Sequence, residues 1–131
     1  MSTSAVASRS RAVTVVSWAA TLVVGLGIGL AGAAKFATRP WHPLFASWGY
    51  PPWVVTVVGA LEIIGAICLF VPRLAFYAAL ALGVMMIGAF ITLRMHPGGP
   101  LGWGATPLFY MVVLAAIAAG RSRDRLAAPQ R

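Results

Sequence analysis

Residues 52–70 form an uninterrupted apolar run that carries one carboxylate, Glu62, near its middle. A helix of this length spans the hydrocarbon core of a bilayer. A charged side chain at bilayer depth costs at least about 2.5 kcal/mol, and it persists where a partner or a polar cavity compensates it. The chain has two acidic residues in all, and the other, Asp124, lies near the C-terminus. We therefore expect the fold to bring a compensating group to Glu62.

The composition is that of an integral membrane protein. Of the 131 residues, 60% are hydrophobic and 9% are charged, whereas soluble domains carry about 25% charged residues. The net charge of +8 would suit nucleic acid. However, the basic residues stand at the ends of apolar runs and not on one polar face, so we predict no nucleic-acid partner. The single cysteine, Cys68, excludes an internal disulfide and a CxxC redox pair.

Turn-forming residues divide the chain into four predicted transmembrane helices within a single domain, residues 1–131. The predicted spans cover about residues 12–35, 52–70, 74–93 and 105–120. Met1–Ser10 is expected to be a short, frayed tail. The first run can also be compared with a signal peptide, with Ala31–Ala33 as a cleavage-like site. It is longer than the usual apolar region of such a peptide, which favours a retained helix.

The first loop is rich in aromatic residues and proline. Tryptophan and tyrosine concentrate at the membrane–water boundary, so we expect a short interfacial helix around Pro43–Trp48 over the mouth of the bundle. Pro72 cannot continue the second helix and places a tight turn there. The segment Arg94–Gly104 is a turn-rich loop. The predicted fold is all-α: an antiparallel four-helix transmembrane bundle with a short interfacial helix in its first outer loop.

The distribution of basic residues predicts the orientation of the chain. The two tails and the second loop hold seven basic residues, and the other side holds three, Lys35, Arg39 and Arg94. Because basic residues accumulate in cytoplasmic loops, both termini are expected in the cytoplasm. The seven are Arg9, Arg11, Arg73, Arg121, Arg123, Arg125 and Arg131.

Lys35 is the predicted partner of Glu62. Small residues, which let membrane helices approach closely, occur at helical spacing beside both side chains. They are Gly25, Gly29 and Gly32 before Lys35, and Gly59, Gly65 and Ala66 around Glu62. Side chains lean toward the N-terminus of their own helix. Because the two helices run in opposite directions, the amine and the carboxylate point at each other.

These positions predict a polar pocket in the outer half of the bundle, beneath an aromatic lid. We predict Glu62 and Lys35 as catalytic residues. The predicted substrate-binding residues are Arg39, His42, Arg94, His96 and Tyr110, and Thr106 is a further hydroxyl near the pocket. No third ligand or helical spacing accompanies the two histidines, so no metal site is predicted.

Four roles for the pocket remain open at this point. It can bind a quinone or a similar ring compound, carry out acid–base chemistry, or relay protons. Alternatively, the Lys35–Glu62 pair fixes the register of the helices and has no further function.

Several motifs together resemble the DoxX or DoxX-like family of small bacterial four-helix membrane proteins. The motifs are Gly32–Phe36, Trp48–Pro51, Gly59–Ala66, Leu69–Pro72 and Met86–Ala89, and the resemblance covers roughly Val13–Ala119. It implies the four-helix fold and a location in a bacterial cytoplasmic membrane. Lys35 and Glu62 are the residues of this chain that match the family's pattern. It also implies a quinone-linked redox subunit or oxidoreductase, acting with a membrane or soluble redox partner, with a quinone as the candidate cofactor. The alternatives are a non-catalytic scaffold subunit and a small-molecule or proton carrier, and the chain is also a candidate homo-oligomer.

Overall fold

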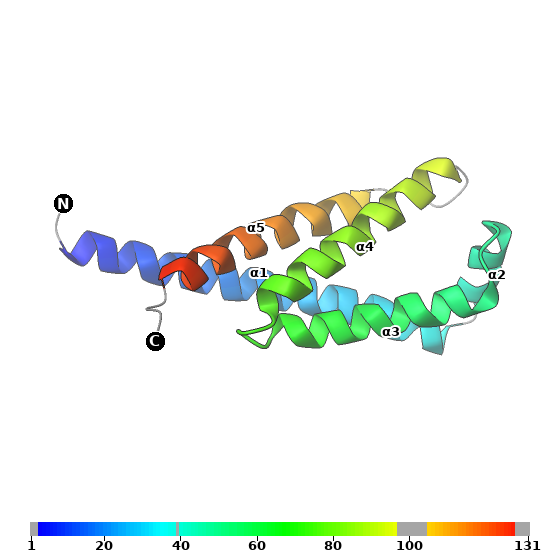
Figure 1. Cartoon of the computed structure of the whole chain (residues 1–131), viewed down its shortest axis with the longest axis horizontal. Helices are drawn as coiled ribbons and strands as arrows, with labels where there is room; N and C mark the ends of the chain where they lie inside the picture. The colour runs from blue at the N-terminus through cyan, green and yellow to red at the C-terminus, as the bar shows by residue number, and fades with distance from the viewer. Residues whose placement is uncertain (1–2, 39, 97–104, 128–131) are drawn as a thin grey trace.

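The computed structural model describes residues 3–38, 40–96 and 105–127, and its elements are helices (Figure 1). Four of the helices are long and apolar enough to cross a membrane. The fifth, α2, is short and lies across one end of the bundle. The helices are α1 (Thr3–Ala37), α2 (Trp41–Ser47), α3 (Pro52–Leu69), α4 (Ala75–Met95) and α5 (Ala105–Ala127).

The four long helices are arranged as two closely packed pairs. Helix α1 packs along α3, and α4 packs along α5, whereas α3 with α4 and α1 with α5 share fewer contacts. The pairs meet at the end that holds the turn Val71–Leu74, and they diverge toward the end that holds α2 (Figure 1). We call these the closed end and the open end. The N-terminal end of α1 and the C-terminal end of α5 lie toward the closed end.

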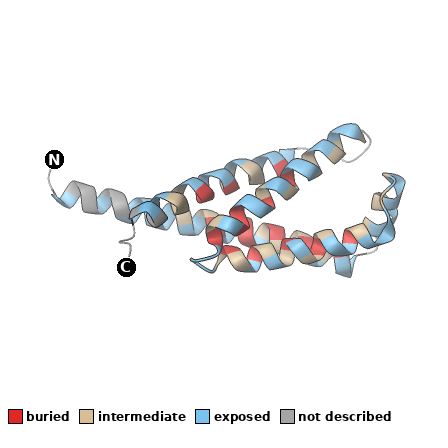
Figure 2. Ribbon diagram, viewed as in Figure 1, coloured by how far each residue is buried: buried red, intermediate tan, exposed pale blue. Residues whose placement is uncertain are grey.

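The buried core lies where the four helices converge near the closed end. Its members are apolar side chains, most of them small or branched, which pack without polar partners. Buried residues line the inward faces of the helices, while the outward faces are exposed (Figure 2). Those outward faces carry large apolar side chains such as Leu30, Val84 and Val112, each about two-thirds exposed. A surface of this kind suits lipid, so the chain is a multi-pass membrane protein. The core residues are Val24, Ile28, Leu69, Ala78, Ala79, Leu82, Met86, Leu114, Ile117 and Ala118.

The structure differs from the sequence-based expectations at the helix ends. Helix α1 begins at Thr3, so the prediction of a frayed tail through Ser10 is wrong. No proline interrupts residues 3–37, and the helix continues beyond its apolar part. Helix α2 begins at Trp41, two residues before the predicted start at Pro43. The first-turn N–H groups of a helix need no intrahelical partner, so Pro43 is tolerated inside that turn.

Candidate functional site

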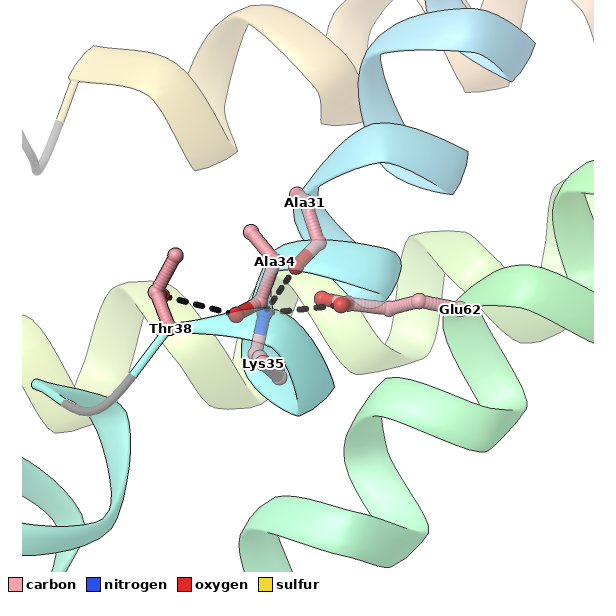
Figure 3. A network of polar contacts seen from close by, with 5 residues as sticks. All are labelled: Ala31, Ala34, Lys35, Thr38 and Glu62. Atoms are coloured by element: carbon pink, nitrogen blue, oxygen red, sulfur yellow. Dashed lines mark hydrogen bonds and ion pairs between the residues drawn. The ribbon is translucent and has the colours of Figure 1, made fainter.

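A buried ion pair joins α1 to α3. Lys35 Nζ lies 2.7 Å from Glu62 Oε2, and the two residues are 7% and 5% exposed. Figure 3 shows the lysine amine and the glutamate carboxylate extending toward each other from the two helices. The amine also lies 3.5 Å from the carbonyl oxygen of Ala31 and 4.7 Å from the centroid of the Trp41 ring. The expected pairing of Lys35 with Glu62 is confirmed.

Glycine residues bring the two backbones together beside this pair. A Cβ atom on Gly32 would lie 2.8 Å from the carbonyl oxygen of Gly59 and 3.0 Å from the Cβ of Glu62. A Cβ atom on Gly59 would lie 3.2 Å from the Cβ of Lys35. Side chains larger than hydrogen would therefore separate α1 from α3 at the level of the ion pair. The expected small-residue faces are confirmed at Gly32 and Gly59, where the two helices meet. Gly65 instead faces Leu82 of α4.

The ion pair lies in the wall of a cavity of about 570 Å³ at the open end. Its lining residues recur at helical spacing, so each helix presents one face to it: Ile28, Ala31 and Lys35 on α1, and Val54, Val58 and Glu62 on α3. The cavity floor is made by Ile28 and Met86, which also belong to the buried core. From α4 and α5 the lining residues are Met85, Met86, Gly88, Ala89, Thr92, Leu93, Thr106, Pro107 and Tyr110.

Aromatic side chains from α2 and the segment after it complete the wall of the cavity. Phe45 is central, with its ring centroid 6.5 Å from that of Trp41, 5.4 Å from that of Trp48 and 5.8 Å from that of Tyr50. Gly49 has φ +83°, a conformation that favours glycine and turns the chain back toward α3. All four aromatic residues line the cavity. They supply flat apolar surfaces, and the Trp41 ring lies against the Lys35 ammonium.

One hydrogen bond links this aromatic cluster to α4. The hydroxyl groups of Tyr50 and Thr92 lie 2.8 Å apart. The Nδ1 of His96 lies 3.0 Å from the carbonyl oxygen of Thr92, and the His96 ring lies 5.9 Å from the Trp48 ring. The segment after α2 is therefore tied to the C-terminal part of α4 at the open end.

The structure brings together some of the predicted site residues. Lys35, Glu62, Tyr110 and Thr106 line the cavity. His42 and Arg94 are exposed and are not among the lining residues. His96 lies behind Trp48, at the edge of the aromatic cluster. Arg39 lies outside the described residues.

Thr92 and the two methionines of α4 are site residues that were not predicted from the sequence. Met85 and Met86 both line the cavity. The spacing of Met85, Ala89 and Thr92 places them on one helical face. That spacing could have identified the face that lines the cavity. Thr92 carries a hydroxyl group within the apolar third span, on the same face as small and flexible side chains.

The site combines a large apolar volume with few polar groups. Ligand pockets of about 300–1,000 Å³ typically have such a lining, with a small number of polar groups that fix the orientation of the ligand. The Lys35 ammonium has three N–H donors, and it contacts the Glu62 carboxylate and, at longer distance, the carbonyl oxygen of Ala31. The hydroxyl groups of Thr106 and Tyr110 lie in the same cavity. The arrangement can therefore offer hydrogen bonds to a carbonyl-bearing apolar compound.

Fold and site together define a four-span membrane bundle with a buried amine–carboxylate pair beside an apolar cavity. The model of the DoxX-like family matches residues 19–119, and the chain belongs to that family. The resemblance noted in the sequence is thereby confirmed. Comparison with curated proteins and with solved structures gives no match.

Proposed function

We propose that this protein binds a lipophilic, quinone-like ring compound in the open-end cavity and serves as a redox-associated membrane subunit. The observation that carries the proposal is the position of the Lys35–Glu62 pair, 2.7 Å apart, in the wall of an apolar cavity of about 570 Å³. A quinone has a flat apolar ring and carbonyl oxygens. The aromatic cluster and the methionines suit the ring, and the Lys35 ammonium suits a carbonyl oxygen.

The charged pair has a specific part in this proposal. In a low-dielectric cavity, a fixed ammonium polarises a carbonyl more strongly than it would in water. Glu62 holds the amine in place and keeps the site neutral overall. Reduction of a quinone consumes two electrons and two protons. The proposal gives this chain the binding of the ring and the handling of protons, and it assigns the electrons to a redox partner subunit.

The orientation of the site also belongs to the proposal. In the sequence, seven basic residues in the two tails and the second loop stand against three in the segments between the other spans, which supports a bacterial cytoplasmic membrane with both termini in the cytoplasm. The open-end cavity then lies in the outer half of the bilayer. A lipid-soluble compound could reach it without crossing an aqueous phase.

Binding of quinone analogues to the purified full chain tests this function. Trp41 and Trp48 line the cavity, so a bound quinone should quench tryptophan fluorescence. We expect saturable quenching by decylubiquinone or by a short-chain naphthoquinone. Lys35→Met should weaken the affinity about tenfold or more, because the hydrogen bond from the ammonium to the ligand is lost. Glu62→Gln should also weaken it, because the ammonium loses the carboxylate that holds it in place.

Arg94→Gln is the matched control, because Arg94 is an exposed cation at the same end and lies outside the cavity lining. It should bind the analogue as the parent chain does. If Lys35→Met and Glu62→Gln keep full affinity and lose only stability, the pair is structural. Activity that appears only with an added partner protein would favour a scaffold. Proton uptake into vesicles that requires Glu62 would favour a carrier.

A further inference from the structure

A second cavity, of about 390 Å³, lies at the closed end between α1 and α5. The two helices pack against each other there (Figure 1). The walls are mostly apolar, with the side chains of Thr14, Ser17 and Arg121 as polar exceptions. The lining residues are Ala12, Val13, Thr14, Val16, Ser17, Trp18, Ala20, Ala116, Ile117, Gly120 and Arg121. This cavity is separate from the open-end site, with which it shares no lining residue.

Arg121, which lines this cavity, has two unsatisfied donors. Its Nε and Nη2 atoms are buried and have no hydrogen-bond partner within the described part of the chain. The guanidinium carbon lies 5.0 Å from the centroid of the Trp18 ring, so the aromatic face holds the group in position. Buried polar atoms of a folded protein are nearly always hydrogen-bonded. An acceptor from outside the described chain would complete this site.

The chemistry of the two donors indicates which acceptor fits. Adjacent N–H groups of a guanidinium match two oxygens of a phosphate group in a forked, charge-assisted arrangement. Ser17, which bears a hydroxyl group, lines the same cavity and can add a hydrogen bond to a phosphate or glycerol oxygen.

The position of the cavity along the membrane spans indicates the source of such a phosphate. Arg121 lies near the end of the candidate span Ala105–Arg123, which is the level of the lipid head groups. Val13 and Val16 line the cavity and are 62% and 66% exposed, so they can contact acyl chains. Basic pockets between transmembrane helices bind anionic head groups, and the net charge of +8 favours an anionic lipid.

We propose that Arg121, with Trp18 beside it, binds the phosphate of an anionic phospholipid in the cavity between α1 and α5. The lipid would fill a gap in the interface between the two helix pairs, where α1 and α5 share fewer contacts than the helices within each pair. This site is independent of the function proposed for the open end.

Native mass spectrometry of the full chain in mild detergent tests this proposal. Phosphatidylglycerol and phosphatidylcholine with identical acyl chains are titrated in parallel. We expect one phosphatidylglycerol to be retained per chain, with about tenfold preference over phosphatidylcholine. Arg121→Gln should remove that preference, since it removes a charge-assisted forked contact. Arg123→Gln makes the same charge change at an exposed position two residues further on, and it should leave the preference unchanged.

Further arms separate the source of the phosphate from general effects of charge and folding. Millimolar inorganic phosphate should not displace the bound lipid, and displacement would overturn the assignment to a phospholipid. Equal losses in Arg121→Gln and Arg123→Gln, or full retention in Arg121→Gln, would overturn it as well. If Arg121→Gln fails to fold, Arg121→Lys keeps the charge without the fork. It should retain the lipid several-fold more weakly than the parent chain, and unchanged retention would contradict the proposal.

Discussion

The closed and open ends are built from the same four helices but are packed in different ways. At the closed end, Ala78, Ala79 and Ala118 let the two pairs converge, and Leu82 packs against Gly65 of α3. At the open end, the aromatic cluster and a cavity of about 570 Å³ lie between the pairs. The closed end is therefore filled by packed side chains, whereas the open end leaves a volume that a ligand could occupy. The ion pair belongs to the open end, where it costs desolvation energy and offers a polar contact.

The largest expected effect concerns the ion pair. Lys35→Met should lower the free energy of unfolding by about 3–5 kcal/mol, because it leaves the Glu62 carboxylate buried without its partner. The double variant Lys35→Met/Glu62→Met should recover most of this loss and still fail to bind the quinone analogue. Unfolding titrations with sodium dodecyl sulfate in mixed micelles measure the stability, and fluorescence quenching measures the binding. A double variant that binds the analogue normally would show that the ion pair is not needed for binding at the open end.

The two ends can be compared directly through two leucines of α4. Leu82→Ala should cost about 2–5 kcal/mol of stability, because Leu82 is 1% exposed in the closed-end core and its truncation leaves a cavity. Leu93→Ala should cost less than about 1 kcal/mol, since Leu93 is partly exposed and already lines a cavity. Leu93→Ala should change the affinity for the quinone analogue more than Leu82→Ala does, because Leu93 lines the cavity. Equal costs at the two positions would show that the ends are packed alike.

The smallest expected effect concerns the contact between the aromatic cluster and α4. Tyr50→Phe removes the 2.8 Å hydrogen bond to Thr92, and it should cost about 1 kcal/mol of stability. Thr92→Val should cost a similar amount, and the double variant should cost little more than either single change. Additive losses would indicate that the two hydroxyls act separately. A weaker affinity for the analogue in both variants would show that the contact also shapes the cavity.

Much of this architecture could be predicted from the sequence, because apolar runs and glycine spacing act locally. The four long helices, the short helix over the open end and the Lys35–Glu62 contact followed from run length, small-residue faces and side-chain direction. The exclusion of His42 and Arg94 from the cavity could not be predicted. Both lie at loop boundaries, where the direction of a side chain depends on tertiary packing. The donors of Arg121 were also missed, since the sequence analysis treated every C-terminal arginine as a signal of orientation.

The near-contact of Gly32 with Gly59 has a consequence for recognising similar sites in other chains. A relative with bulkier residues at these two positions could keep its lysine, its glutamate and all four spans, yet hold the two charged groups on helices too far apart to meet. The residues at positions 32 and 59 therefore indicate whether the amine reaches the carboxylate. The presence of the lysine and the glutamate alone does not. Transfer of a role from one such chain to another should begin with those two glycines.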